Sequence, residues 1–171
     1  MRGALVLLIL AAAITLQTTV ARFFVGRMTI DVVLIAVVFV ALSFGPVAGL
    51  LGGSVAGLAE DALSGGVIGI GGLAKSIVGF LAGTIGSQFI VSSALPRFVM
   101  FFVATLVHTA CFLGVHALLP DARSIAVPYG RTVVQAAANG VVGLLIFQTI
   151  EGLPGLLQRR RMNRAYRRRR V

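Results

Sequence analysis

The residues of this chain that could do chemistry are few, and the most conspicuous are an acidic pair, Glu60 and Asp61, inside a glycine-rich apolar stretch. Charged side chains are costly in apolar surroundings and usually have a function there. The pair is preceded by glycines at four-residue spacing: Gly45, Gly49, Gly53 and Gly57. This spacing places the glycines on one face of a helix, and Asp61 is the next position of the same face. The acid is therefore predicted to lie on a helix-packing surface.

A second set with the same spacing follows in the next apolar stretch: Gly71, Lys75, Gly79 and Gly83. Lys75 is the only lysine of the chain. If Ser64–Gly69 forms a bend between two antiparallel helices, Asp61 and Lys75 lie near it and face one another, which predicts an ion pair. The alternative is that both side chains reach into water at the membrane face. Glu60 lies one position round the helix and is expected to be solvated.

Catalytic and metal-binding patterns are not found. His108 has no helical partner histidine with a nearby carboxylate, so no metal site is predicted, and Cys111 is alone, so no disulfide or cysteine cluster is predicted. No Ser-His-Asp arrangement, phosphate loop or nucleotide motif is present. The chain is therefore predicted to be no enzyme and to hold no cofactor. His108 is expected to form a hydrogen bond between helices, and Asp31 to be an ordinary helix-terminal residue.

The composition is that of a membrane protein. The chain has 171 residues, of which 58% are hydrophobic and only 12% charged, and its mean hydropathy is +1.01. Soluble domains carry about a quarter charged residues. At about 20 residues per membrane span, the chain can form five or six helices and no sizeable domain in water. A catalytic domain in water is therefore excluded.

The apolar runs predict an all-α transmembrane bundle of six helices with short connections such as Ser92–Arg97. The runs are Gly3–Val20, Thr29–Phe44, Pro46–Leu63, Ile70–Phe89, Phe98–Leu119 and Thr132–Ile150. No polar residue separates the second run from the third, which meet at Gly45 and Pro46. They form either a tight hairpin or one broken helix with a re-entrant half, and in the second case the bundle has five helices. Residues 1–154 are assigned to the bundle and 155–171 to a basic cytoplasmic tail.

The formal charge of +10 is concentrated in this tail. Its arginines are Arg159, Arg160, Arg161, Arg164, Arg167, Arg168, Arg169 and Arg170. In a membrane protein such a run marks the cytoplasmic side rather than a nucleic-acid site, and with six spans the amino terminus is cytoplasmic as well. The arginines are also expected to bind the surface of an anionic leaflet, which makes membrane lipids a predicted partner.

The stretch from Pro46 to Gly83 resembles the rod shape-determining protein MreD family of bacterial inner-membrane proteins. The resemblance rests on a proline, then a glycine-rich helix that ends Gly57-Leu-Ala-Glu-Asp61, then Gly69 and a second glycine-led helix. It implies a fold similar to the six-helix substrate-binding subunits of energy-coupling-factor transporters. It also implies a non-enzymatic scaffold for cell elongation, rod shape and lateral peptidoglycan synthesis. The implied partners are the bitopic protein MreC and, through it, the MreB filament and RodA with a class B penicillin-binding protein.

A second function stays open at this point, a small-molecule-binding membrane subunit of a transporter. Such a subunit needs a polar cavity near the middle of the membrane. Its candidate lining residues are Gln135, Asn139, His108 and Asp61. Gln135, Asn139 and Gly143 share a four-residue spacing that forms a polar seam, which could equally bond a neighbouring helix. The glycine faces are expected to pack helices within the bundle more than between chains.

Overall fold

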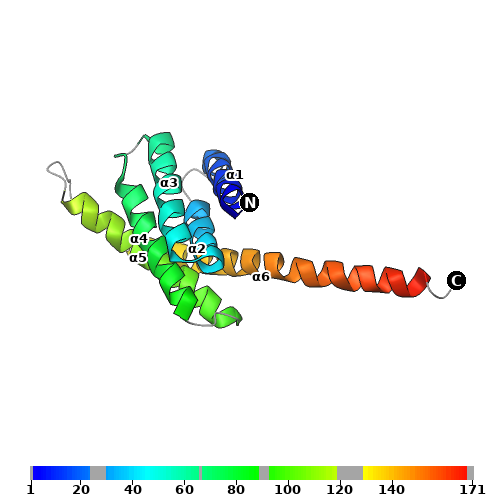
Figure 1. The fold of residues 1–171 in the computed structure, drawn as a ribbon. Coiled ribbons are helices and arrows are strands. Elements are labelled where there is room, and N and C mark those ends of the chain that lie inside the picture. The colour runs from blue at the N-terminus through cyan, green and yellow to red at the C-terminus, as the bar shows by residue number, and fades with distance from the viewer. Residues whose placement is uncertain (1, 24–29, 66, 89–92, 119–128, 169–171) are drawn as a thin grey trace.

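The computed structural model describes residues 2–23, 30–65, 67–88, 93–118 and 129–168, and all regular secondary structure in them is helical. The helices are α1 (Arg2–Phe23), α2 (Val32–Phe44), α3 (Pro46–Ser64), α4 (Ile70–Gln88), α5 (Ala94–Ala117) and α6 (Tyr129–Arg168) (Figure 1). Each apolar run of the sequence corresponds to one of them. The predicted all-α class is therefore confirmed for the described part of the chain.

Three helical segments in the described residues are long and apolar enough to cross a membrane. They are α4, α5 and the Tyr129–Ile150 part of α6. Gly3–Thr19 of α1 and Val32–Phe44 of α2 are apolar but shorter. A full span needs about 20 apolar residues, so the described residues hold three candidate spans, and a count of six spans stays a prediction.

Helix α2 is the centre of the bundle and packs against all five other helices. Every residue from Val33 to Ala41 is buried. A helix that is apolar on all sides has no face suited to water, and burial on all sides is the arrangement such a helix requires. Its 13 residues correspond to about 20 Å of helix. Since the hydrocarbon layer is about 30 Å thick, the helical part of α2 is shorter than a full span.

The junction of α2 and α3 is a single glycine. Gly45 has φ +93°, a conformation that side chains rarely adopt, and its N–H donates to the carbonyl of Ala41 at 2.9 Å. Pro46 then opens α3, where its missing N–H costs nothing. Gly49 and Gly52 of α3 lie against Ala41 and Val40 of α2, so the two helices run antiparallel. Of the two arrangements left open by the sequence, the tight hairpin is the one found.

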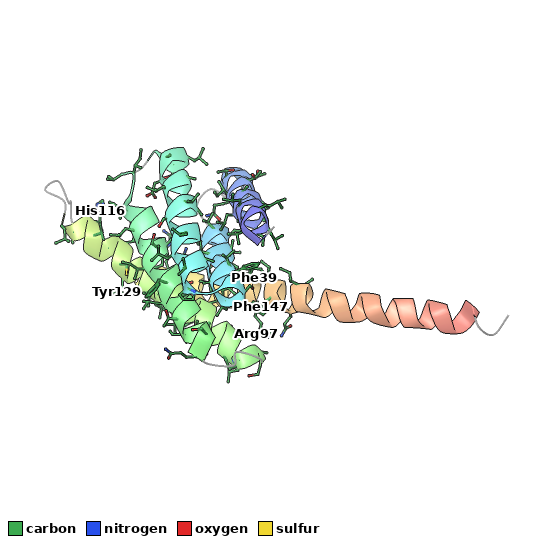
Figure 2. The ribbon with its side chains drawn as sticks, viewed as in Figure 1. Phe39, Arg97, His116, Tyr129 and Phe147 are labelled. Atoms are coloured by element: carbon green, nitrogen blue, oxygen red, sulfur yellow. The ribbon has the colours of Figure 1, made fainter. Side chains whose placement is uncertain are left out.

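Helices α5 and α6 contact each other through Arg97 and Phe147. This contact lies at the amino-terminal end of α5, far from the α5–α6 connection. Arg97, which the sequence placed in a connecting segment, lies in the first turn of α5 and is buried, because α5 begins at Ala94 rather than at Phe98. Its guanidinium lies 4.4 Å from the centre of the Phe147 ring, and that ring meets Phe39 of α2 edge-on at 5.3 Å (Figure 2). A cation over an aromatic face is attractive, so this charge is accommodated inside the bundle.

Helix α6 is much longer than a membrane span. Its 40 residues correspond to about 60 Å, and its carboxyl-terminal half extends away from the other helices (Figure 1). The backbone of most of the predicted basic tail therefore continues the last helix. The side chains of the tail arginines lie outside the described residues.

Candidate functional site

The bundle contains a buried charged cluster centred on Lys75 of α4. The ammonium Nζ lies 2.9 Å from Glu60 Oε2 of α3 and 3.2 Å from Asp31 Oδ2 at the start of α2. It also lies 3.4 Å from Nε2 of His108 on α5. An ammonium has three N–H donors and no acceptor, so Nε2 accepts and the three contacts match the three donors. The lysine side chain is only 5% exposed, so these contacts replace its hydration.

Asp31 connects this cluster to the start of α2. Its Oδ1 accepts the N–H of Leu34 at 2.7 Å, which caps the helix, while Oδ2 contacts Lys75. The N–H of Asp31 donates to Asn139 Oδ1 of α6 at 3.0 Å, and the next N–H, of Val32, donates to Gln17 Oε1 of α1 at 2.8 Å. Two of the N–H donors at the start of α2 thus bond to side chains of other helices, and a third bonds to the Asp31 cap.

Asn139 extends the cluster to α5. It is fully buried, and its Nδ2 donates to Thr105 Oγ1 at 3.1 Å, whose hydroxyl donates to the carbonyl of Phe101 at 2.9 Å. With Gln17 on α1 and Glu60 on α3, the polar contacts therefore include residues from all six helices. Interhelical hydrogen bonds of this kind hold membrane helices together where the hydrophobic effect cannot. The chemistry of the cluster is that of ion pairs and hydrogen bonds that fix the positions of the helices.

Asp61 has a separate task in the turn between α3 and α4. Its Oδ2 accepts the N–H of Gly69 at 2.9 Å and the N–H of Gly72 at 3.2 Å. These donors belong to the start of α4, where a carboxylate also suits the positive end of the helix dipole. Gly65 and Gly69 have φ of +69° and +109°, which glycine adopts at no steric cost. Gly71 lies directly against the Asp61 carboxylate. The acid therefore fixes the hairpin.

The two glycine series lie against each other and bring the α3 and α4 backbones into close contact. A Cβ on Gly49 would meet Gly79, one on Gly53 would meet the Lys75 carbonyl, and one on Gly57 would meet Gly72. At the other end, Gly83 lies against Pro46 and Gly45. Gly45 itself belongs to the α2–α3 junction and not to a helix. The remaining members of both series contact within the chain, the arrangement favoured from the sequence.

The predicted pairing of Asp61 with Lys75 is wrong. In the antiparallel register, Gly57 lies opposite Gly72 and Gly53 lies opposite Lys75. Asp61 is therefore two turns from the position opposite Lys75 and meets the amino-terminal end of α4 instead. Glu60 was expected in water, but its side chain is 22% exposed and contacts Lys75. Asp31 was expected to be an ordinary terminal residue, but it adds an ion pair to its capping role.

The other candidate residues are distributed as follows. His108 forms the predicted contact between helices, with Lys75 as its partner. Asn139 lies in the network, whereas Gln135 is half-buried one turn away and Gly143 packs against the Phe101 ring. Among the described residues no group of three histidine, cysteine or acidic side chains could hold a metal ion. The sequence missed Gln17 and Thr105, which carry no charge and follow no spacing that would distinguish them from other membrane-helix residues.

The Asp61 cap allows a direct test. Asp61→Ala removes both acceptor contacts and should cost about 1–2 kcal/mol, the usual loss for a helix cap. Asp61→Asn keeps an acceptor oxygen and should cost less. Unfolding can be followed in detergent with a thiol-reactive dye, because the chain has no tryptophan and a single, half-buried cysteine, Cys111. Equal losses in the two variants would show that hydrogen bonding is not what Asp61 contributes.

Comparison with known proteins identifies the family of this chain. The family model described as rod shape-determining protein MreD matches residues 1–150. No curated protein and no solved structure matches the chain, so the expected similarity to energy-coupling-factor subunits stays a prediction. The matched range covers the glycine-packed hairpin, its Asp61 turn and the Lys75 cluster. The match leaves out only residues 151–171, which include the basic extension of α6. The chain therefore belongs to the MreD family of membrane proteins, with a role in determining rod shape.

Proposed function

We propose that this protein is a non-enzymatic scaffold of the bacterial cell-elongation machinery, bound to a single-pass partner resembling MreC. Family membership supports a role in rod shape. The proposal extends this role to lateral peptidoglycan synthesis. Through the MreC-like partner, the protein would be linked to an MreB filament and to RodA with a class B penicillin-binding protein. Because the buried polar groups of this bundle bond to one another, we propose that it acts by binding other proteins.

The observation that carries the proposal is the use of the buried polar residues. A transporter subunit needs convergent polar groups that are free to meet a ligand. Here His108 contacts Lys75, Asn139 bonds to Asp31 and Thr105, and Asp61 bonds to backbone N–H groups. Three of the four residues that could have lined a cavity are thus occupied in joining helices. This favours a scaffold over the alternative of a small-molecule-binding subunit.

The proposal includes a location and an orientation. We place the protein in the inner membrane with both termini in the cytoplasm. The support is the run of arginines that follows Ile150, the end of the third candidate span. Arginines close to a span resist translocation, and they also attract anionic lipids of the cytoplasmic leaflet.

The proposed function predicts two outcomes in a rod-shaped host. The tagged protein should co-purify with an MreC-like single-pass protein from mild detergent, whereas an unrelated polytopic protein with the same tag should not. Deletion of the gene should give rounded cells with reduced lateral wall synthesis, and a wild-type copy should restore the rods. Microscopy and incorporation of a fluorescent wall precursor measure both effects.

Normal shape and wall synthesis after a clean deletion would contradict the scaffold. Saturable binding of a vitamin-like ligand by the purified protein, with no co-purifying partner, would favour the transporter subunit instead.

A further inference from the structure

The charged cluster around Lys75 contains two carboxylates and a single ammonium. Lys75 Nζ lies 2.9 Å from Glu60 Oε2 and 3.2 Å from Asp31 Oδ2. His108 accepts from the same ammonium through Nε2 at 3.4 Å, and an imidazole that accepts a hydrogen bond is uncharged. When both acids are ionised, the cluster therefore carries one negative charge in excess. An excess charge is unfavourable inside an apolar bundle.

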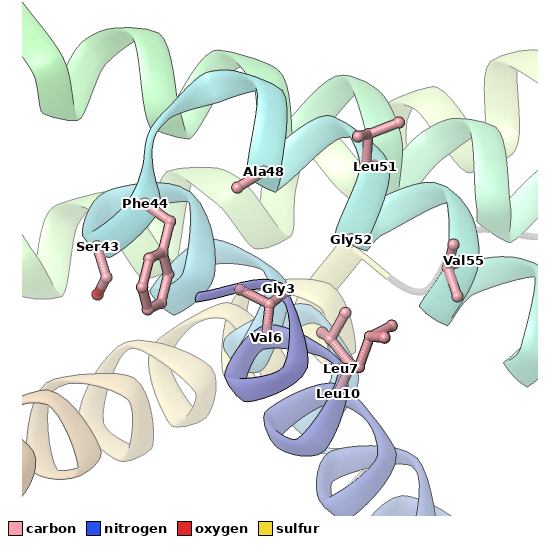
Figure 3. Close-up of a pocket in the computed structure, with 10 residues that line it drawn as sticks. All are labelled: Gly3, Val6, Leu7, Leu10, Ser43, Phe44, Ala48, Leu51, Gly52 and Val55. Carbon is pink, nitrogen blue, oxygen red and sulfur yellow. The ribbon is translucent and has the colours of Figure 1, made fainter. Parts of the chain in front are cut away.

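The groups that face the cluster from the surrounding helices are acidic or uncharged. Asp61 is a further acid, and its carboxylate bonds to the start of α4. Gln17 of α1 and Asn139 of α6 are uncharged and bond to N–H groups at the start of α2. Tyr129 and Arg131 at the start of α6 are exposed. Toward α1, helix α3 borders an apolar groove whose lining residues include no acid and no base (Figure 3).

A proton is the counter-charge that fits this cluster. A metal ion shared by the two carboxylates would have to take the position that the Lys75 ammonium already holds. A proton needs no such space, because it forms an O–H bond on one carboxyl oxygen and makes that group neutral. Acids that lie close together in a poorly hydrated site share protons in this way.

The contacts of each group indicate which one carries the proton. A proton on His108 would remove the Nε2 acceptor and place a second cation 3.4 Å from Lys75 Nζ. Asp31 uses both oxygens, one for the N–H of Leu34 and one for Lys75, so a proton there would weaken the helix cap or the ion pair. The contact that the structure describes for the Glu60 carboxylate is the one with Lys75, and a neutral carboxyl oxygen can still accept from an ammonium.

Glu60 is also the acid that water reaches more easily. Its side chain is 22% exposed, compared with 10% for Asp31. It lies four residues, about one helical turn, before the end of α3 at Ser64. Water at this face of the bundle can therefore deliver the proton and take it away.

We propose that the cluster binds one exchangeable proton, which comes from water at the face where α3 ends and is carried by Glu60. Binding makes the cluster neutral and leaves the Lys75 ammonium paired with Asp31. Glu60 then changes from an ion-pair partner of Lys75 to a hydrogen-bond acceptor. The contact between α3 and α4 at this end thus depends on pH. This site does not depend on the proposed scaffold function.

The test is infrared spectroscopy of the full-length protein in phosphatidylcholine nanodiscs during a pH titration. The C=O stretch of a protonated carboxyl group should be present at neutral pH and absent in Glu60→Gln. Asp31→Asn leaves one acid for one lysine, so the band should disappear although Glu60 is still present. Asp61→Asn is the matched control, because it removes the neighbouring acid but keeps both carboxylates beside Lys75, and it should retain the band.

Thermal unfolding followed by circular dichroism supplies a second measurement. A glutamate of the unfolded chain binds a proton only near pH 4.3 or about that value. The folded protein would hold one more proton than the unfolded chain at neutral pH, so its unfolding temperature should fall as the pH is raised through the transition of the band. Glu60→Gln resembles the protonated carboxyl group and should lack this dependence.

Three results would overturn the proposal. The first is a Glu60 band that appears only at about pH 4.3, as for a glutamate in water. The second is a band that survives in Asp31→Asn, since the excess of acid over lysine would then not be its cause. The third is stability that responds to sodium concentration and not to pH, which would assign the counter-charge to a metal ion. If Glu60→Gln does not fold, the wild-type titration and Asp31→Asn still decide between these outcomes.

Discussion

Lys75→Met should leave little folded protein in the membrane. The substitution keeps the length and the apolar stem of the side chain but leaves Asp31 and Glu60 next to one another without a cation. Breaking a buried ion pair from one side costs about 3–5 kcal/mol. Proteins have only about 5–15 kcal/mol of stability, so most of it would be lost. The measurements are the amount of monodisperse protein in detergent and the unfolding temperature from dye reaction at Cys111.

Removing the whole charged group should restore much of this loss. In the triple variant Asp31→Asn, Glu60→Gln, Lys75→Met, no uncompensated charge remains, and asparagine can still cap α2. Recovery of the triple variant above Lys75→Met is the expected result. If the triple variant is as poor as the single one, the cost lies in lost packing and not in buried charge.

Double-mutant cycles separate the pairing in the structure from the one predicted by the sequence. Glu60→Gln and Lys75→Met should show a clear interaction energy, because the two groups are 2.9 Å apart. Asp61→Asn and Lys75→Met should come closer to additivity, because Asp61 bonds to the start of α4. A larger coupling in the Asp61 cycle would contradict the register of the hairpin.

Gly53→Ala should destabilise the protein far more than a single methyl group normally does. Its Cβ would meet the carbonyl of Lys75 and the backbone N of Ser76, and these backbone atoms cannot turn aside. Overpacking costs about 1–3 kcal/mol, and a contact with backbone belongs at the upper end. Gly53→Leu should prevent the docking of α3 on α4 altogether, because a longer side chain keeps the backbones apart. Unfolding temperature and yield in detergent measure both effects.

Gly114→Ala on α5 is the matched control. A Cβ at Gly114 has nothing within 4 Å, so the better helix propensity of alanine should leave stability unchanged or raise it by up to about 1 kcal/mol. Similar behaviour of the Gly53 and Gly114 variants would show that the close approach of α3 and α4 is not required.

Much of the fold follows from local rules. Runs of apolar residues predict the helices because each must satisfy its backbone internally in lipid. Gly45 and Pro46 predict the break between α2 and α3, since the first allows a positive φ and the second cannot continue a helix from within. The four-residue spacing of Gly49, Gly53 and Gly57 predicts their shared face, which meets α4. These signals lie within one or two turns of chain.

The sequence did not predict which residues pair with the charged side chains, because these pairs depend on the register between helices and on segments distant in the chain. Asp61 and Lys75 are each on the expected face, but the alignment of α3 with α4 separates them by two turns. Asp31 reaches Lys75 only because α2 starts inside the bundle. The continuation of α6 beyond Ile150 was missed because Pro154 and its neighbouring glycines favour an end to the helix.

The position of Asp31 has a consequence for the order of events during synthesis. Its N–H bonds to Asn139, 108 residues farther along the chain. The ribosome therefore releases α2 long before it makes the lysine and the asparagine that satisfy this end. Until then the Asp31 carboxylate lies at the edge of a short apolar segment without its cation, and a charge without a partner is unfavourable in the membrane. We therefore expect the central helix of the bundle, although among the first to be made, to be among the last to reach its final position.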